Sequence, residues 1–270
     1  MSFLDKLQQA ASGNRSLLCV GLDPVPEQVP ACLRDRSDPV LAFNAAIIAA
    51  TADLVCAYKP NFAFYGALGA GGWATLAATL ARVPPGVPVI VDAKVGDIGN
   101  TAERYARMFL DELGADAVTV SPYMGRDAVL PFVERGDRGV FVLCLTSNPG
   151  AADFETQTLA GGAPLYEEVT RRVCQWNTAG NCGLVVGATQ PEALARIRRL
   201  APDLPFLVPG VGAQGGDVRA VVQAGCDAAG AGLVINASRS VLYASPGADF
   251  AEAARQEAMR LRDQINQYRR

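Results

Sequence analysis

Short apolar segments alternate with segments of helical periodicity along most of the chain. Eight of the apolar segments are short and rich in Val, Ile, Leu and Ala, as is typical of strands buried on both faces of a sheet. These predicted strands are 16–22, 54–59, 88–94, 117–121, 139–146, 183–187, 205–209 and 227–234. The intervening segments are long enough for helices, so the pattern predicts a parallel sheet covered by helices.

The helical pattern is clearest in Thr101–Leu113. One face of that segment is apolar: Ala102, Tyr105, Ala106, Phe109 and Leu113. Asn100 followed by Glu103 resembles a capping box that would begin this helix.

Eight strand-helix units favour a single-domain (β/α)8 TIM barrel over residues 1–270. An open doubly wound sheet is the alternative. It is less favoured because the first predicted strand runs into Gly21-Leu-Asp-Pro-Val-Pro, which lacks the glycine-rich turn of a dinucleotide-binding fold.

Composition narrows the class of protein. Half of the 270 residues are hydrophobic and the net charge is -3, without a basic cluster, so we expect no nucleic-acid partner. No apolar run is long enough for a membrane span, and the N-terminus lacks a signal-peptide pattern. The seven cysteines are scattered without a CxxC pair, which is typical of core residues in a reducing cytoplasm.

The chain contains no histidine. This absence excludes a Ser-His-Asp triad and a Cys-His dyad, and it removes the most common zinc ligand. Proton transfer near neutral pH would have to use Lys, Asp, Glu, Tyr or Cys.

Acidic and basic residues are concentrated in Asp92-Ala-Lys-Val-Gly-Asp97, at the end of an apolar run. If 88–94 is a strand, Ile90, Asp92 and Lys94 share one face, because side chains alternate along a strand. The cluster has two interpretations. Asp92 and Lys94 could form an ordinary ion pair while Asp97 caps the next helix, or the cluster could be catalytic.

Further polar residues follow the other predicted strands, and in a barrel the carboxyl ends of all strands meet at one rim. They are Asp23, Lys59, Ser147 and Gln214. The glycine-rich segment Pro209–Gly216 and Arg239 follow the last two strands, where barrel enzymes usually bind phosphate. The long segment Asn148–Pro164 lies at the same rim and suggests a lid.

These motifs together resemble the orotidine 5′-monophosphate decarboxylase family, in its longer bacterial (type 2) branch. The resemblance runs through nearly the whole chain and is carried by Gly21-Leu-Asp23, Tyr58-Lys-Pro-Asn61, Asp92-Ala-Lys-Val-Gly-Asp-Ile-Gly-Asn-Thr101, Ser121-Pro-Tyr-Met-Gly125, Leu145-Thr-Ser-Asn-Pro149, Val208-Pro-Gly-Val-Gly-Ala-Gln-Gly215 and Ala237-Ser-Arg-Ser240. The D-x-K-x-x-D motif in combination with the PGVGAQGG segment is specific.

The resemblance implies decarboxylation of orotidine 5′-monophosphate to UMP, the last step of pyrimidine synthesis, without cofactor or metal. It places Lys94, Asp92, Asp97 and Lys59 in the catalytic group. Lys94 would deliver a proton to C6 as CO2 departs, and Asp92 would lie against the substrate carboxylate.

The resemblance also implies a homodimer in which Asp97, Ile98 and Thr101 enter the active site of the partner subunit. Substrate-binding roles follow for a larger set. Asp23 and Lys59 would contact the ribose, Ser147 the pyrimidine ring, and Gln214 and Arg239 the phosphate, beside Pro209 and the backbone of Ser238.

The chain departs from close relatives at two positions, where Val95 replaces a frequent arginine and Ser238 a frequent glycine. Two other functions are possible. The first is a Mg²⁺-dependent sugar-phosphate decarboxylase of the 3-keto-L-gulonate 6-phosphate type, which carries an acidic ligand where this chain has Lys59. The second is a barrel that binds nucleotides without catalysis.

Overall fold

Parallel strands form the centre of the molecule in the computed structural model, which describes residues 1–210 and 217–269. The strands are β1 (Leu18–Gly21), β2 (Ala57–Lys59), β3 (Ile90–Val95), β4 (Ala117–Val120), β5 (Gly139–Leu145), β6 (Cys182–Val186), β7 (Phe206–Pro209) and β8 (Leu233–Ala237). They pair in the order β2-β1-β8-β7-β6-β5-β4-β3.

Isolated parallel bridges between Tyr58 and Val89 and between Asn61 and Asp92 join the two outer strands. The amide of Tyr58 donates to Pro88, and that of Asp92 to Pro60. The sheet therefore closes on itself, and the predicted TIM barrel is confirmed.

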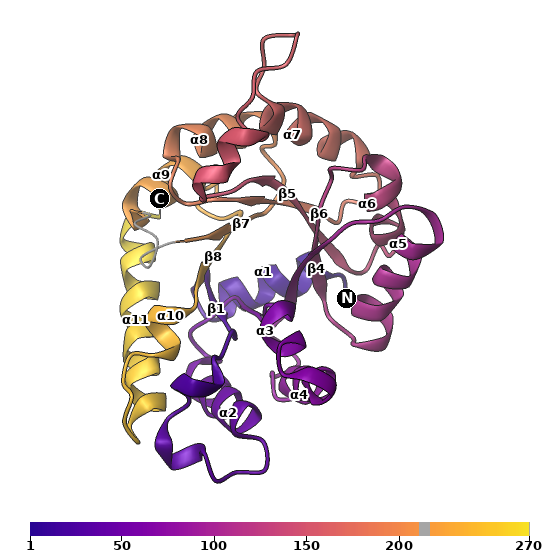
Figure 1. The fold of residues 1–270 in the computed structure, drawn as a ribbon. Helices are drawn as coiled ribbons and strands as arrows, with labels where there is room; N and C mark the ends of the chain where they lie inside the picture. Colours follow the sequence, from indigo (N-terminus) through magenta and orange to yellow (C-terminus); the bar gives the residue numbers. More distant parts are fainter. Residues whose placement is uncertain (211–216, 270) are drawn as a thin grey trace.

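Helices surround the barrel (Figure 1). They are α1 (Phe3–Gly13), α2 (Pro39–Thr51), α3 (Phe62–Gly66), α4 (Gly72–Leu80), α5 (Gly99–Ala106), α6 (Arg126–Val133), α7 (Leu165–Trp176), α8 (Pro191–Leu200), α9 (Val218–Gly225), α10 (Arg239–Leu242) and α11 (Phe250–Tyr268). Short 3₁₀ segments lie at Pro26–Gln28, Ala31–Leu33, Gly69–Gly71 and Pro149–Asp153, and a π-helical segment at Arg107–Glu112. Within the described ranges, no helix combines the length and the apolar character that crossing a membrane requires.

The core has two parts. The larger lies between the sheet and the surrounding helices. The smaller includes apolar side chains of the barrel interior, against which α1 packs Phe3 and Leu7. Helix α1 thus covers the end of the barrel at which the strands begin and leaves the opposite end open for a site.

Two local predictions from the sequence are wrong. The eighth strand begins at Leu233, because Asp227 starts a turn: its carboxylate accepts from the amides of Ala229 and Ala231, and Gly232 has φ 76°. The capping box at Asn100 does not form. Helix α5 has Ile98 as its N-cap, without a side-chain hydrogen bond.

The segment predicted as Thr101–Leu113 is helical, but it changes from an α-helix to a π-helix at Arg107. The long segment Asn148–Pro164 projects from the barrel at the top of Figure 1. An antiparallel bridge between Thr158 and Pro164 closes its tip.

Candidate active site

Alternation along the strands places polar side chains directly above the apolar layer of the interior. Cys19, Ala57, Ile90, Ala117 and Val234 belong to that layer. Two residues further along β2, β3, β4 and β8, the inward side chains are Lys59, Asp92, Thr119 and Asn236, all of them buried. The carboxyl end of the barrel therefore carries a polar layer.

A cleft of about 600 Å³ opens above this layer and is called the central cleft below. The predicted site residues that line it are Asp23, Lys59, Asp92, Lys94, Ser147, Pro209, Ser238 and Arg239. Asp97, Ile98 and Thr101 do not line it, and Gln214 lies outside the described residues.

Opposite charges alternate across the floor of the central cleft. Lys59 Nζ lies 3.7 Å from Asp23 Oδ2 and 3.3 Å from Asp92 Oδ2. Lys94 Nζ lies 2.6 Å from Asp92 Oδ1. Lys59 and Asp92 are 3% and 8% exposed, whereas the Lys94 side chain is 40% exposed. Both lysines line the central cleft, and Lys94 is the more exposed of the two.

The pKa values follow from this arrangement. Burial acts to raise the pKa of Asp92, but the charges of Lys59 and Lys94, with hydrogen bonds from Lys94 and Thr119, lower it to about 2. Burial acts to lower the pKa of Lys59, but the carboxylates of Asp23 and Asp92 raise it well above its ordinary value. Both groups are ionised at neutral pH.

The backbone of β3 departs from regular strand geometry at the site. In the pairing with β4, Val91 lies opposite Val118 but Val95 lies opposite Val120, so β3 bulges between these pairs. Lys94 within the bulge has φ 46°, a left-handed conformation that is uncommon for a side chain of this size. The bulge aims Lys94 back towards Asp92.

Asp23 is held by neighbours from two other strand ends. Its Oδ1 accepts from the amide of Asn61 at 2.7 Å, and its Oδ2 accepts from Ser238 Oγ at 2.8 Å. A Cβ added at Gly21 would lie only 1.8 Å from Ser238 Oγ. Glycine at position 21 therefore leaves room for the contact between Ser238 and Asp23.

Two polar atoms at the cleft lack partners among the described residues. They are Ser147 Oγ and Asn236 Oδ1, both buried. Buried polar groups are normally hydrogen-bonded, so these atoms are candidates for ligand contacts. A Cβ at Gly187 would lie 2.2 Å from Ser147 Oγ, which explains why the turn after β6 begins with glycine.

The interpretation of Asp97 as a helix cap is wrong. Asp97 Oδ1 accepts from the amide of Ile98 at 2.8 Å, and α5 has no side-chain cap. In the described part of the chain, no lysine or arginine lies within ion-pair distance of Asp97. Its carboxylate is free to act elsewhere.

Three polar residues of the site were not predicted from the sequence: Thr119, Asn61 and Asn236. Thr119 and Asn236 are polar residues within apolar runs, at positions whose parity matches the interior, and that signal could have identified them. Asn61 Nδ2 donates to Asp92 Oδ2 at 3.4 Å. Its role depends on the bridge between β2 and β3, which the sequence does not reveal.

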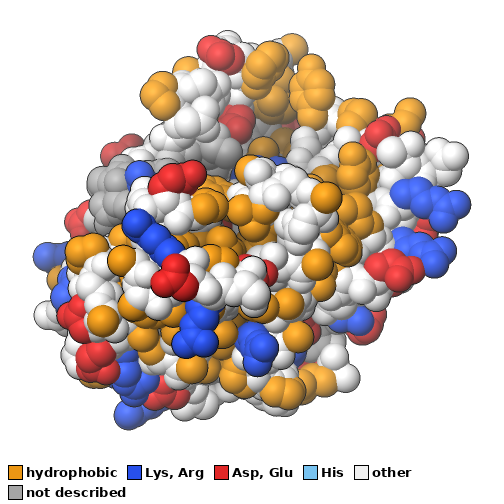
Figure 2. All heavy atoms as spheres, turned by 60° about the horizontal axis from the view of Figure 1, so that its bottom comes forward, with side chains coloured by type: hydrophobic (Ala, Val, Ile, Leu, Met, Phe, Trp, Pro, Cys, Tyr) orange, Lys and Arg blue, Asp and Glu red, His pale blue; other side chains and the backbone are white. Residues whose placement is uncertain are grey.

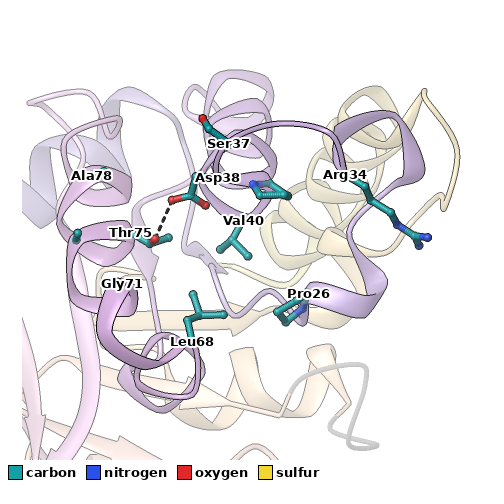
Figure 3. Close-up of a pocket in the computed structure, with 11 residues that line it drawn as sticks. Pro26, Arg34, Ser37, Asp38, Val40, Leu68, Gly71, Thr75 and Ala78 are labelled. Carbon is teal, nitrogen blue, oxygen red and sulfur yellow. Dashed lines mark hydrogen bonds between the residues drawn. The ribbon is translucent and has the colours of Figure 1, made fainter.

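A second hollow, of about 680 Å³, lies beside α2 and α4 (Figure 3). Asp38 in this hollow accepts from Thr75 Oγ1 at 2.7 Å and from the amide of Leu41 at 2.9 Å, where it caps α2. Arg34 points away from Asp38 (Figure 3). Both oxygens of the Asp38 carboxylate therefore serve to stabilise α2 and its contact with α4, and the central cleft is the better candidate for an active site.

Comparisons with known proteins agree with the motifs. A family model described as orotidine 5′-phosphate decarboxylase / HUMPS family matches residues 16–256. Orotidine 5′-phosphate decarboxylase of Roseiflexus castenholzii is 56% identical over 268 residues, which cover 98% of each chain. That of an Azoarcus species is 53% identical over 273 residues and covers 100% of both chains.

Solved structures are similar over the full length as well. The Leishmania donovani OMP decarboxylase has a TM-score of 0.86 at 44% identity, covering 100% of this chain and 99% of that one. A putative orotidine 5′-phosphate decarboxylase from Streptomyces avermitilis has a TM-score of 0.84 at 32% identity, covering 99% and 95%. The chain therefore belongs to the orotidine 5′-phosphate decarboxylase family of carboxy-lyases.

Proposed function

We propose that this chain converts orotidine 5′-monophosphate to UMP and CO2, with Lys94 as the proton donor to C6 of the pyrimidine. The proposal rests on the contact between Lys94 and Asp92 at the floor of the central cleft. It is also supported by relatives more than 50% identical over the full length that carry this activity in their names.

The proposed chemistry needs only side chains of the protein. As the bond between C6 and the carboxylate breaks, its electron pair remains on C6 and CO2 leaves. The Lys94 ammonium stabilises the developing negative charge and then transfers a proton to C6, after which the neutral amine takes a proton from water. Because Asp92 already holds Lys94 at 2.6 Å, the cation needs little reorganisation during the reaction.

Asp92 would lie against the substrate carboxylate. An ionised Asp92, with a pKa near 2, would repel that carboxylate, and the repulsion would end when CO2 departs. Since ground-state strain of this kind is a contested source of catalysis, we assign the larger share to stabilisation of the carbanion by Lys94.

The other cleft residues suit the remaining parts of the substrate. Asp23 and Lys59 would bind ribose hydroxyls, and the Ser147 hydroxyl, which has no hydrogen-bond partner among residues 1–210 and 217–269, would bind the pyrimidine. Arg239, which is exposed at the start of α10, would bind the phosphate with Gln214. Pro209 and the backbone of Ser238 border the same part of the cleft.

We also propose that the active form is a homodimer in which Asp97, Ile98 and Thr101 reach the partner's cleft. Their own cleft does not use them, and Ile98 is 55% exposed. Exposed Tyr123, Met124 and Phe154 follow β4 and β5, the next strands in the sheet order. Several exposed apolar side chains on loops after neighbouring strands are typical of a protein interface.

The most direct test mixes purified protein with orotidine 5′-monophosphate in EDTA and follows the ultraviolet change of the ring. We expect rapid turnover by the parent protein. Lys94→Ala should lose at least about 10³-fold in kcat, because it lacks both the proton donor and the cation. Lys6→Ala is the matched control, since Lys6 pairs with Asp116 at the covered end of the barrel.

Three outcomes would contradict the proposal. Equal turnover by Lys94→Ala would remove its role as proton donor. Abolition by EDTA with rescue by Mg²⁺ would indicate the metal-dependent sugar-phosphate decarboxylase. Binding of UMP without any turnover of orotidine 5′-monophosphate would indicate a nucleotide-binding barrel.

A further inference from the structure

Thr119 lies at the centre of β4, is fully buried, and faces the interior directly beneath the catalytic cluster. Its Oγ1 lies 3.0 Å from the amide of Ala93, 2.9 Å from the amide of Lys94 and 2.9 Å from Asp92 Oδ1. A hydroxyl has one proton and two acceptor lone pairs, so this one uses its full capacity.

The direction of each hydrogen bond is fixed by chemistry. The two amides can only donate, and the ionised carboxylate of Asp92 can only accept. The Thr119 hydroxyl therefore accepts from both amides and donates to Asp92.

These bonds fall at the irregular part of β3. The bulge between Val91 and Val95 interrupts the ladder with β4. The Thr119 hydroxyl takes the place of the missing ladder acceptor for the amides of Ala93 and Lys94, and Lys94 there adopts its left-handed φ of 46°.

The same hydroxyl meets the acid partner of Lys94. Asp92 Oδ1 accepts from both Thr119 Oγ1 and Lys94 Nζ, while Oδ2 faces Lys59 and Asn61. One side chain thus contacts both ends of the Lys94–Asp92 pair: the backbone of the lysine and the carboxylate of the acid.

We infer that Thr119 is a positioning residue for the reaction, whose hydroxyl fixes the bulge of β3 and the carboxylate of Asp92 so that the Lys94 ammonium points into the central cleft. This inference rests on the proposed role of Lys94. Thr119 itself does not line the cleft, so it would act through Lys94 and Asp92.

Thr119→Val tests the inference because valine replaces the hydroxyl by a methyl group of similar size and leaves both amides without their acceptor. Lys94 would then sample several positions. We expect kcat to fall about 10- to 100-fold, as for a small misplacement of a reacting group, while KM changes less than about threefold. Thr119→Ser retains the hydroxyl and should recover kcat to within about fivefold of the parent.

Thr170→Val is the matched control. Thr170 on α7 is also fully buried and its hydroxyl is also hydrogen-bonded, to Tyr166 O and near Cys144 Sγ, but it lies outside the cleft. The Thr170→Val variant should lose about as much stability as Thr119→Val, and its kcat should equal that of the parent. A Thr119→Val variant with parental kcat, or with a loss no larger than that of Thr170→Val, would overturn the inference.

A spectroscopic readout separates positioning from a purely structural role. Lys6, Lys59 and Lys94 are the lysines of the chain, so ¹³Cε-labelled lysine gives a simple NMR spectrum. In Thr119→Val the Lys94 signal should shift or broaden, while that of Lys6 stays unchanged. An unchanged Lys94 signal would overturn the inference even if kcat falls.

Two further results keep the outcomes distinct. If Thr119→Val does not fold, Thr119→Cys replaces the hydroxyl by a weakly hydrogen-bonding thiol, and parental kcat in that variant would contradict the inference. If Lys94→Ala is fully active, the proposed function of Lys94 fails. The NMR signal then still tests whether Thr119 positions this side chain.

Discussion

At the scale of single residues, the site is governed by a balance between burial and charge. Removing a carboxylate from water costs several kcal/mol of free energy. Attraction to an opposite charge at about 4 Å stabilises it by roughly 4 kcal/mol at an effective dielectric near 20. Asp92 has two such cations, at 2.6 and 3.3 Å, so it stays ionised in spite of its burial. The array is therefore charged before any substrate binds.

This balance predicts how stability depends on pH. The pKa of Asp92 is lowered to about 2, so its ionised form contributes stability that is present above its ordinary pKa and is lost as pH falls towards 2. We expect Asp92→Asn to be less stable than the parent by on the order of 2 kcal/mol at pH 6, and the difference to shrink below pH 4. Urea unfolding at constant protein concentration between pH 7 and pH 3 measures it.

Asp111→Asn provides the control for this measurement. Asp111 pairs with Arg135 at 2.9 Å on the surface, where its side chain is 45% exposed and water screens the pair. Its substitution should change stability by less than about 1 kcal/mol across the range. A difference between parent and Asp92→Asn that does not vary with pH would show that ionisation of Asp92 is not its source.

At the scale of elements, much of the fold could be predicted from the sequence because strand and helix periodicities are local. The eight strands were found in order, and Asp23, Lys59, Asp92 and Ser147 were placed correctly at their carboxyl ends. The arrangement of residues within those ends could not be predicted in the same way, because it depends on register between strands.

The bulge in β3 illustrates this limit. It is defined by pairing with β4, whose Thr119 supplies the hydroxyl that replaces the ladder bonds of Ala93 and Lys94. Nothing within the segment from Asp92 to Asp97 indicates that a threonine about 25 residues away completes it. Likewise, the turn at Asp227 that delays β8 depends on side-chain hydrogen bonds within apolar and glycine-rich surroundings.

Helix α1 gives a prediction at this scale. Phe3 is buried, packs edge-on against Phe141 with ring centroids 5.8 Å apart, and occupies space that a Cβ at Gly139 would fill. Phe3→Ala should cost about 3 to 5 kcal/mol of unfolding free energy, through lost burial and a residual cavity. Because α1 covers the end of the barrel opposite the cleft, kcat of the folded enzyme should not change.

Denaturant unfolding and steady-state kinetics on the same preparation check this separation. If the kcat of Phe3→Ala is lower than that of the parent at denaturant concentrations at which the variant is still folded, the separation of stability and activity between the two ends of the barrel is contradicted.

At the scale of the whole molecule, the proposed dimer with shared sites rests on which residues lie at the surface and which line the cleft. Basic and acidic side chains are interspersed with hydrophobic ones over the face in Figure 2 rather than gathered by sign. At the carboxyl end, the loops after β3, β4 and β5 expose Ile98, Tyr123 and Phe154. The central cleft holds Asp92 and Lys94 but not Asp97, although Asp97 is only five positions after Asp92 in the chain.

Mixing two inactive variants tests whether Asp97 serves a neighbour. In a dimer of one Lys94→Ala subunit and one Asp97→Ala subunit, the cleft with an intact Lys94 would receive an intact Asp97 from its partner. Random exchange of subunits should therefore restore about a quarter of the parental activity per subunit, since half of the dimers are mixed and one of their two sites is complete.

Lys94→Ala mixed with Lys59→Ala is the control and should restore none, because Lys59 and Lys94 line the same cleft and every site then lacks one of them. If Asp97→Ala is inactive alone and exchange with Lys94→Ala restores no activity, Asp97 acts within its own subunit and the shared-site dimer is wrong.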